Sequence, residues 1–181
     1  MKVIKRVLNG VLILQPRIFH DDRGFFYEYF NRNAFREATG LEIEFVQDNL
    51  AHSRYGVLRG MHFQRAPYRQ AKLVGVIKGE IFDVVADIRP GSPTFGQWFS
   101  VILNDINRYQ LFIPKGFAHG YLSLADDTYV FYKTDAFYHR DFDAGFRYDD
   151  PRTAIRWPEI KGGYILSEKD RNLPFLKDLF G

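Results

Sequence analysis

Short apolar runs broken by turn residues recur along most of the chain, and within them apolar and polar positions alternate. The clearest run is 81–89, where the two kinds of side chain take opposite faces: Phe82, Val84, Ala86 and Ile88 against Asp83, Asp87 and Arg89. This period of two predicts a half-buried strand. The same signature predicts further strands at 25–30, 57–62, 71–78, 98–103, 109–113, 117–124 and 128–134.

Turn and cap residues divide these runs and add two short helices. Gly79 lies between the runs 71–78 and 81–89 and predicts a hairpin there, while 104–105 and 126–127 mark further turns. Asn31 can cap a helix that Gly40 ends, and a second helix is expected from near Ser167 to just before Pro174. Little helix beside many strands argues against a βαβ fold and favours a mainly β jelly roll or similar closed double sheet.

Composition narrows the class of protein. The 181 residues suit one domain, 1–181, and 46% hydrophobic residues suffice for a core. The absence of cysteine excludes disulfides, thiolate metal sites and a cysteine nucleophile. The apolar run 11–14 is too short for a signal-peptide core or a membrane span, so we expect a soluble cytoplasmic protein without membrane association. A net charge of +3 without a basic tract gives little support for nucleic-acid binding.

Two of the five histidines lie in segments that suggest a site. His119 ends the pattern Pro-x-Gly-x-x-His at 114–119, which cupin barrels use to present a histidine inward, and His62 lies in the glycine-containing segment 56–64. Cupins usually add a His-x-His and a glutamate that hold a metal, but here Phe63 and Gln64 follow His62, and then come the cations Arg65, Arg69 and Lys72. A divalent metal prefers neutral imidazoles and a carboxylate. We therefore expect no metal, and a cavity that binds an anion or stabilises one formed during a reaction.

Acid–base candidates surround this expected cavity. His62 has an imidazole whose ordinary pKa suits proton abstraction, although it could equally be a core histidine tied to a carbonyl. Tyr132 shares a strand face with Val130 and Thr134, so its phenol either donates a proton or merely packs. Lys72 could pair with a developing oxyanion or be a solvated strand residue. Asp170 could orient a histidine or cap the short helix near Ser167.

Several segments together resemble the dTDP-4-dehydrorhamnose 3,5-epimerase family over nearly the full length. They are DRGFFYE at 22–28, QDN at 47–49, GVLRGMHFQ at 56–64, KLV at 72–74, DIRPGSPTFG at 87–96, PKGFAHG at 114–120, DDP at 149–151 and LSEKD at 166–170. Each piece alone is weak, but their order and spacing are specific. The resemblance implies a cupin-type jelly roll (a double-stranded β-helix barrel) and a cofactor-independent isomerase, usually a homodimer that exchanges N-terminal strands.

The resemblance also implies a role for each matching residue. His62 is similar to the catalytic base, Asp170 to the acid that orients it, Tyr132 to the proton donor on the other sugar face, and Lys72 to the residue that steadies the enolate. Arg59 and His119 resemble sugar contacts, and Tyr138 the aromatic that stacks on thymine. The remaining family binding positions are Arg23, Glu28, Gln47, Asp48, Asn49, Asp143 and Lys169, of which some can come from the dimer partner.

The implied reaction inverts C3 and C5 of dTDP-4-dehydro-6-deoxy-D-glucose through an enolate and yields dTDP-4-dehydro-L-rhamnose, a step in making rhamnose for a surface polysaccharide. Three other interpretations stay open from the sequence. The chain could be a mono-epimerase acting at one centre, a metal-dependent cupin, or a non-catalytic barrel that binds a sugar nucleotide. Product analysis by NMR, the metal content and an activity assay separate them.

Overall fold

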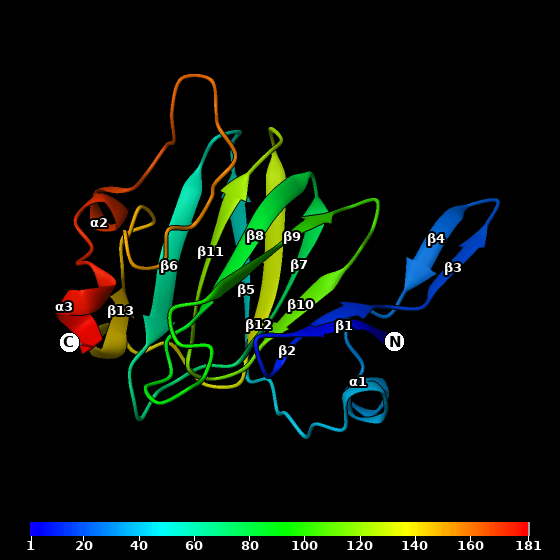
Figure 1. Ribbon diagram of the computed structural model, residues 1–181. Coiled ribbons are helices and arrows are strands. Elements are labelled where there is room, and N and C mark those ends of the chain that lie inside the picture. Colours follow the sequence, from blue (N-terminus) through cyan, green and yellow to red (C-terminus); the bar gives the residue numbers. More distant parts are fainter. Residues whose placement is uncertain (181) are drawn as a thin grey trace.

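The computed structural model describes residues 1–180, which form two antiparallel sheets packed face to face (Figure 1). The first sheet has the strand order β1-β2-β10-β7-β12-β5 and the second β13-β6-β11-β8-β9. The strands of the first sheet are β1 (Lys2–Val7), β2 (Val11–Gln15), β10 (Gln110–Ile113), β7 (Lys72–Lys78), β12 (Thr128–Thr134) and β5 (Gln47–Ser53). Those of the second are β13 (Asp143–Gly145), β6 (Leu58–Gln64), β11 (Phe117–Ser123), β8 (Glu80–Asp87) and β9 (Trp98–Asn104). The mainly β, cupin-type jelly roll expected from the sequence is confirmed.

The core lies between the two sheets and continues outside them. Inward-facing side chains from both sheets, among them Val74, Val85 and Val130, form the central cluster. A second cluster lies on the outer face of the second sheet, where the C-terminal part of the chain covers Val84 and Ala86. Because this face is covered as well, β8 is buried on both sides. The expectation of a half-buried strand at 81–89 was therefore wrong, and Asp83 and Asp87 are both fully buried.

The predicted hairpin around Gly79 is also wrong. β7 and β8 belong to different sheets, so the chain turns a corner at Gly79 instead of folding back on itself. The backbone there has a φ of +86°, and a Cβ at this position would lie 2.5 Å from the Thr128 hydroxyl, so only glycine fits. A glycine between two apolar runs suits both a hairpin turn and a corner between two sheets, so the local sequence pattern does not distinguish them.

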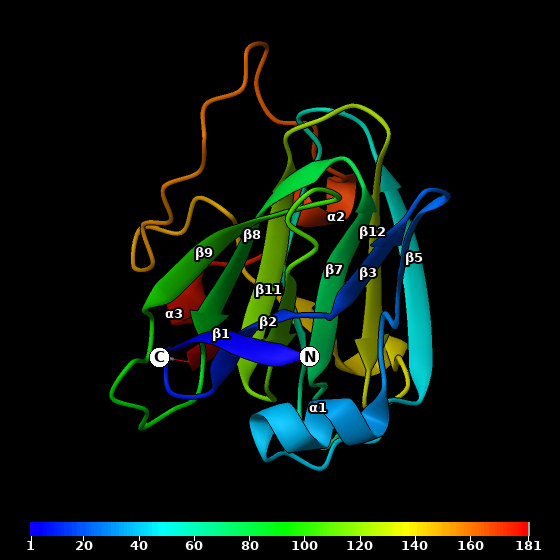
Figure 2. The same ribbon diagram turned by 90° about the vertical axis from the view of Figure 1, so that its right-hand side faces the viewer.

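Two further strands leave the barrel as a separate hairpin. β3 (Ile18–Asp21) and β4 (Gly24–Tyr27) pair only with each other and project from the body beside β1 (Figure 1). The helix α1 (Arg32–Thr39) follows and lies at one end of the first sheet (Figure 2). Its predicted caps are confirmed, since the Asn31 side chain accepts from the amide of Ala34 and Gly40 adopts the left-handed conformation.

The C-terminal part of the chain lies against the second sheet. The helix α2 (Glu168–Arg171) begins where predicted, with Ser167 as its N-cap, and is followed by α3 (Leu176–Phe180). A 3-10 turn, η1 (Arg140–Phe142), precedes β13. The sequence patterns had not indicated β1, β2, β3, β5, β13 or α3. Polar residues interrupt the apolar positions of β1 and β5, and β3, β13 and α3 are very short. Within residues 1–180, no helix is both long and apolar enough to span a bilayer.

Candidate active site

A cavity opens between the two sheets and is lined by strands from both. It has a volume of about 280 Å³, and we call it the inner cavity. Its polar lining comes from β6, β7, β11, β12 and the α2 region: Arg59, His62, Lys72, His119, Tyr132, Lys169 and Asp170. The curved sheets thus bring together residues that are up to 111 positions apart in the sequence, from Arg59 to Asp170.

His62 and Asp170 form a hydrogen-bonded pair at the wall of this cavity. The imidazole Nε2–H donates to Asp170 Oδ1 over 2.5 Å, which leaves Nδ1 free to accept a proton. Ser167, the N-cap of α2, donates its hydroxyl to Asp170 Oδ2 and accepts from the Asp170 amide. Burial is the largest single influence and pushes the pKa of Asp170 upward, but the hydrogen bonds from His62 and Ser167 and the nearby Lys169 charge together outweigh it, so the pKa lies below its ordinary value. Asp170 is therefore a fixed carboxylate that orients the His62 imidazole.

Tyr132 lies on β12 and lines the same cavity as His62. Val130, Tyr132 and Thr134 point to one side of the strand, as the alternation predicted, and β12 is held between β5 and β7. Burial raises the pKa of the Tyr132 phenol, although the Arg59 guanidinium opposes that shift. The phenol therefore carries its proton at neutral pH and can donate it.

Lys72 begins β7 and points into the barrel. Burial lowers the pKa of its ammonium to about 8, although the carboxylates of Asp143 and Asp83 oppose the shift. Within the described chain the ammonium makes no hydrogen bond or ion pair with another side chain. An unpaired, partly desolvated cation in a cavity is suited to stabilise negative charge that develops on a bound molecule.

His119 has a buried partner that the sequence reasoning missed. Its Nε2–H donates to Asp83 Oδ1 over 2.5 Å, and its position on β11 is opposite His62 on β6. Asp83 is fully buried, and its Oδ2 has no hydrogen-bond partner among the described residues. The available signal was an aspartate in the middle of an apolar strand, on the face opposite Val84 and Ala86. Because that face of the strand was expected to be exposed to solvent, Asp83 was not identified as a partner of His119.

Arg59 closes one side of the inner cavity. Its guanidinium donates to the Ser53 hydroxyl over 3.1 Å and to the His52 carbonyl over 3.0 Å. These bonds connect β6 to β5 of the opposite sheet and hold the guanidinium in one orientation. A fixed guanidinium can bind phosphate or sugar oxygens with little further loss of side-chain entropy.

A second cavity, the outer cavity, adjoins the inner one and has a volume of about 240 Å³. His62, Lys72, Tyr132 and Lys169 line both cavities. The lining of the outer cavity also includes four further predicted binding residues, Gln47, Asn49, Tyr138 and Asp143, and the nearby Gln64. The outer cavity is therefore continuous with the proposed reacting groups and has the polar lining that a bound nucleotide needs.

Hydrogen bonds already organise the outer cavity. Gln47 donates to Asn49 over 2.8 Å and accepts from the Tyr138 amide over 3.0 Å. The Tyr138 hydroxyl donates to Asp143 over 2.9 Å, and Lys169 pairs with the same carboxylate. Tyr138 remains about half exposed, so its ring is accessible for stacking.

Three predicted binding residues lie away from both cavities of their own chain. Arg23 is at the β3–β4 turn, with its side chain 89% exposed and paired with Asp21. Glu28 accepts from Asn31 near the start of α1. Asp48 alternates outward from Gln47 and Asn49 on β5 and pairs with Lys133 over 2.5 Å. A single chain therefore does not assemble the complete predicted set.

Possible metal ligands are sparse in the part of the chain that the structure covers. Residues 1–180 contain no group of three or more histidine, aspartate or glutamate side chains that could hold a metal ion. The two histidines of the inner cavity each donate Nε2–H to a separate carboxylate.

Comparisons with known proteins add independent information. The family model described as dTDP-4-dehydrorhamnose 3,5-epimerase matches residues 5–178. An Escherichia coli K12 protein of that name is 51% identical over 179 residues, which is 99% of this chain and 96% of the relative.

Solved structures give the same family. The Bacillus anthracis dTDP-4-dehydrorhamnose 3,5-epimerase, with TDP and PPi bound, superposes with a TM-score of 0.92 at 46% identity, covering 96% of this chain and 98% of that one. A Legionella pneumophila 3,5-epimerase in complex with dTDP-4-keto-L-rhamnose has a TM-score of 0.89 at 46% identity, covering 94% and 89%.

Proposed function

The chain belongs to the dTDP-4-dehydrorhamnose 3,5-epimerase family, and from this membership we propose a reaction and a role for each group in the inner cavity. The enzyme is an isomerase that acts on a dTDP-linked sugar. Its substrate is dTDP-4-dehydro-6-deoxy-D-glucose, which it inverts at C3 and C5 to give dTDP-4-dehydro-L-rhamnose. The observation that carries the proposal is that the free Nδ1 of an oriented histidine, a protonated phenol and an unpaired ammonium all face one cavity.

The first step is removal of a proton next to the ketone. The C4 carbonyl acidifies the hydrogens on C3 and C5, and His62 takes one of them through Nδ1 while Asp170 stabilises the imidazolium that forms. The electron pair moves to O4 as an enolate. Lys72 stabilises that oxygen with a charge that no other side chain neutralises. Since the substrate already carries the ketone, the scheme needs no redox cofactor and no metal.

The second step returns a proton to the opposite face of the same carbon. Tyr132 supplies it, and the collapsing enolate takes up the proton with inversion of the centre. His62 then loses its proton to solvent, and Tyr132 regains one, before the cycle repeats at the other carbon. Arg59 and His119 hold the sugar, and the outer cavity holds the nucleotide, with Tyr138 stacked on the base. Remote binding of this kind fixes the ring against the base.

The direct test is product analysis in deuterated water. We expect ¹H NMR to show deuterium at both C3 and C5 of the product, together with the L-lyxo configuration. Trapping of the product by the reductase that follows in rhamnose synthesis should pull the reaction to completion. Deuterium at only one centre would identify a mono-epimerase, and no exchange at either would remove the enolate scheme.

Tyr132→Phe should uncouple exchange from inversion. The base remains, so we expect proton exchange at C5 to persist within about tenfold of the wild-type rate, while epimerisation falls by about 10²-fold or more because no donor faces the other side. Both rates come from one NMR time course in deuterated water. Tyr129→Phe, on the other face of β12, is the matched control. Full epimerase activity of Tyr132→Phe would remove the phenol from the mechanism.

The β3–β4 hairpin is the proposed route by which a second copy completes the site. It carries three exposed aromatic residues, Phe19, Phe25 and Phe26, and its turn carries Arg23. Exposed aromatic side chains on a projecting hairpin are typical of a surface that another chain covers. In a homodimer that exchanges these strands, Arg23 and Glu28 would meet the nucleotide in the partner subunit's outer cavity.

Mixing two impaired variants tests this exchange. Arg23→Ala should raise KM about tenfold or more, through loss of a diphosphate contact, and His62→Asn should be inactive. In a heterodimer, one site pairs the intact His62 of one chain with the intact Arg23 of the other. Refolding the two variants together should therefore restore low-KM activity. If Arg23 serves its own chain, the mixture will show only the sum of the two separate activities.

A further inference from the structure

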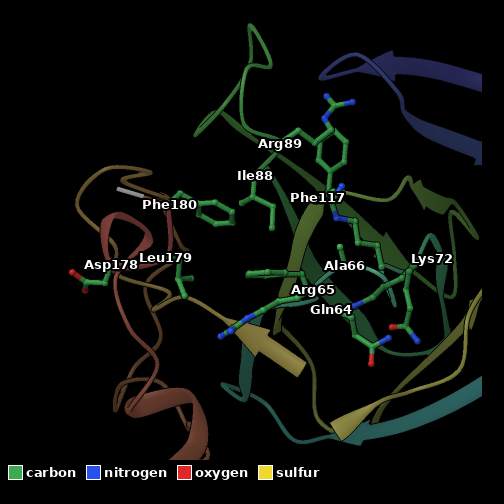
Figure 3. A pocket seen from close by; sticks show the side chains of 14 residues that line it. Gln64, Arg65, Ala66, Lys72, Ile88, Arg89, Phe117, Asp178, Leu179 and Phe180 are labelled. Atoms are coloured by element: carbon green, nitrogen blue, oxygen red, sulfur yellow. The ribbon is translucent and has the colours of Figure 1, made fainter. Parts of the chain in front are cut away.

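A third cavity shares part of its lining with the outer cavity, but the rest of its lining has a different chemical character. This rear cavity has a volume of about 360 Å³, within the range of small-molecule sites. Its apolar lining comes from the ends of β6, β8 and β11 and from α3: Phe63 together with Ile88, Phe117, Leu179 and Phe180, the last four labelled in Figure 3. Nothing in the proposed reaction uses this space.

Cations without carboxylate partners also line the rear cavity. Arg65 and Arg69 follow β6 in an exposed loop, and within residues 1–180 neither guanidinium makes a hydrogen bond or ion pair with another side chain. Lys72 lies at the inner end, likewise unpaired. Arg89 differs, because its guanidinium pairs with Asp87 and points away past Phe117 (Figure 3). Asp178 also points away from the cavity (Figure 3). The cavity thus presents three unneutralised positive charges.

Hydrogen bonds fix side chains that the rear and outer cavities share. Both cavities are lined by Phe63, Gln64, Gln70 and Lys72. The Gln64 amide donates to the carbonyls of Tyr68 and Phe137 and accepts from the His139 amide, and Gln70 donates to the Ala136 carbonyl over 2.8 Å. Since these side chains are tied to backbone groups, a nucleotide in the outer cavity would not extend through them.

We propose that the rear cavity binds a small phosphorylated compound with a flat apolar body, and that its occupancy lowers the rate of epimerisation through Lys72. The phosphate would bind between Arg65 and Arg69, where bidentate guanidinium contacts suit its geometry. The apolar body would lie against Phe63, Phe117 and Phe180. Lys72 lines the rear and the inner cavity, so an anion in the rear cavity attracts the ammonium away from the sugar ketone. This rate effect, unlike the binding, rests on the proposed function.

Binding of phenyl phosphate in the presence of saturating dTDP tests the site. The dTDP occupies the outer cavity, so remaining heat in a calorimetric titration reports a separate site. We expect one phenyl phosphate per chain, binding about tenfold or more weakly in Arg65→Ala and in Arg69→Ala. Arg6→Ala, an exposed arginine on β1, is the matched control and should bind as the wild type does. Phenol, which lacks the charge, should not bind.

The kinetic consequence is measured separately. Phenyl phosphate should lower kcat severalfold with little change in KM, and Arg65→Ala should abolish this inhibition while keeping the uninhibited rate. Loss of phenyl phosphate binding when dTDP is present, or unchanged affinity in both arginine variants, would overturn the site. Binding with no effect on kcat would overturn the link to Lys72. An enzyme without epimerase activity would still report on the binding, so the two proposals fail independently.

Discussion

His62→Asn is expected to abolish both epimerisation and solvent exchange at C3 and C5, each by about 10³-fold or more. The variant keeps a side chain of similar size beside Asp170 but has no basic nitrogen facing the cavity, so the first proton transfer is lost. Because every later step needs the enolate, exchange and inversion must fall together. This separates the base from Tyr132, whose loss should affect inversion more than exchange. The measurement is deuterium incorporation by NMR.

One control variant tests for a general loss of structure, and a second variant tests the carboxylate that orients His62. His52→Asn changes a histidine that pairs with Asp127 away from the cavities, and it should keep wild-type rates. Asp170→Asn should lower the rate by about 10²-fold, because the imidazole loses the carboxylate that fixes its tautomer and stabilises its charge. Wild-type exchange in His62→Asn, with the melting temperature unchanged, would assign the proton abstraction to another group.

The fold was predictable where a single strand or cap carries the information. Asn31 and Gly40 bound α1 as expected, and the alternation on β12 placed Tyr132 facing inward. How one strand is placed relative to another was harder to predict from the sequence. A glycine between apolar runs suits a hairpin as well as a corner, and only the placement of β7 and β8 in different sheets decides which one forms at Gly79. The pattern of 81–89 separated the two faces correctly, but it did not show that the Asp83 face points into the barrel while the C-terminal segment covers the face of Val84 and Ala86.

The candidate site likewise contains residues that the sequence predicted and others that it did not. Segment spacing led to His62, Lys72, Tyr132 and Asp170, and the structure brings all four to one cavity, although their roles stay predictions. Asp83 was missed because a buried carboxylate looks like a solvent-facing one in a sequence. Arg23 is a further limit, because the packing of its own chain leaves it exposed and away from the cavities, and its proposed place in a partner's site stays a prediction. Long-range packing therefore decides much of what the local pattern leaves open.

Lys72→Met is expected to lower kcat by about 10²- to 10³-fold while making the protein more stable. Methionine fills the space of the lysine stem but provides no charge for the enolate oxygen, and loss of one such donor has an effect of this size. The alkaline side of the wild-type pH profile should report the same group. Activity should fall as the pH rises through about 8, where the buried ammonium of Lys72 loses its proton. A flat profile from pH 7 to 10 would exclude a role for its charge.

The stability change has the opposite sign and its own pH dependence. The folded-state pKa of Lys72, about 8, lies below the ordinary value of 10.5, so at neutral pH the unfolded chain binds this proton more tightly and the charged lysine opposes folding. Removing the charge should raise the free energy of unfolding at pH 7 by about 3 kcal/mol, or roughly 9 °C in melting temperature. Between pH 8 and 10.5 the wild type loses the penalty, so the stability curves of the wild type and Lys72→Met should converge.

Lys161→Met, at an exposed loop position, should show neither effect. A gain in stability that does not vary with pH would come from packing alone, whereas convergence together with lost activity would show that the same buried charge serves catalysis and weakens the fold.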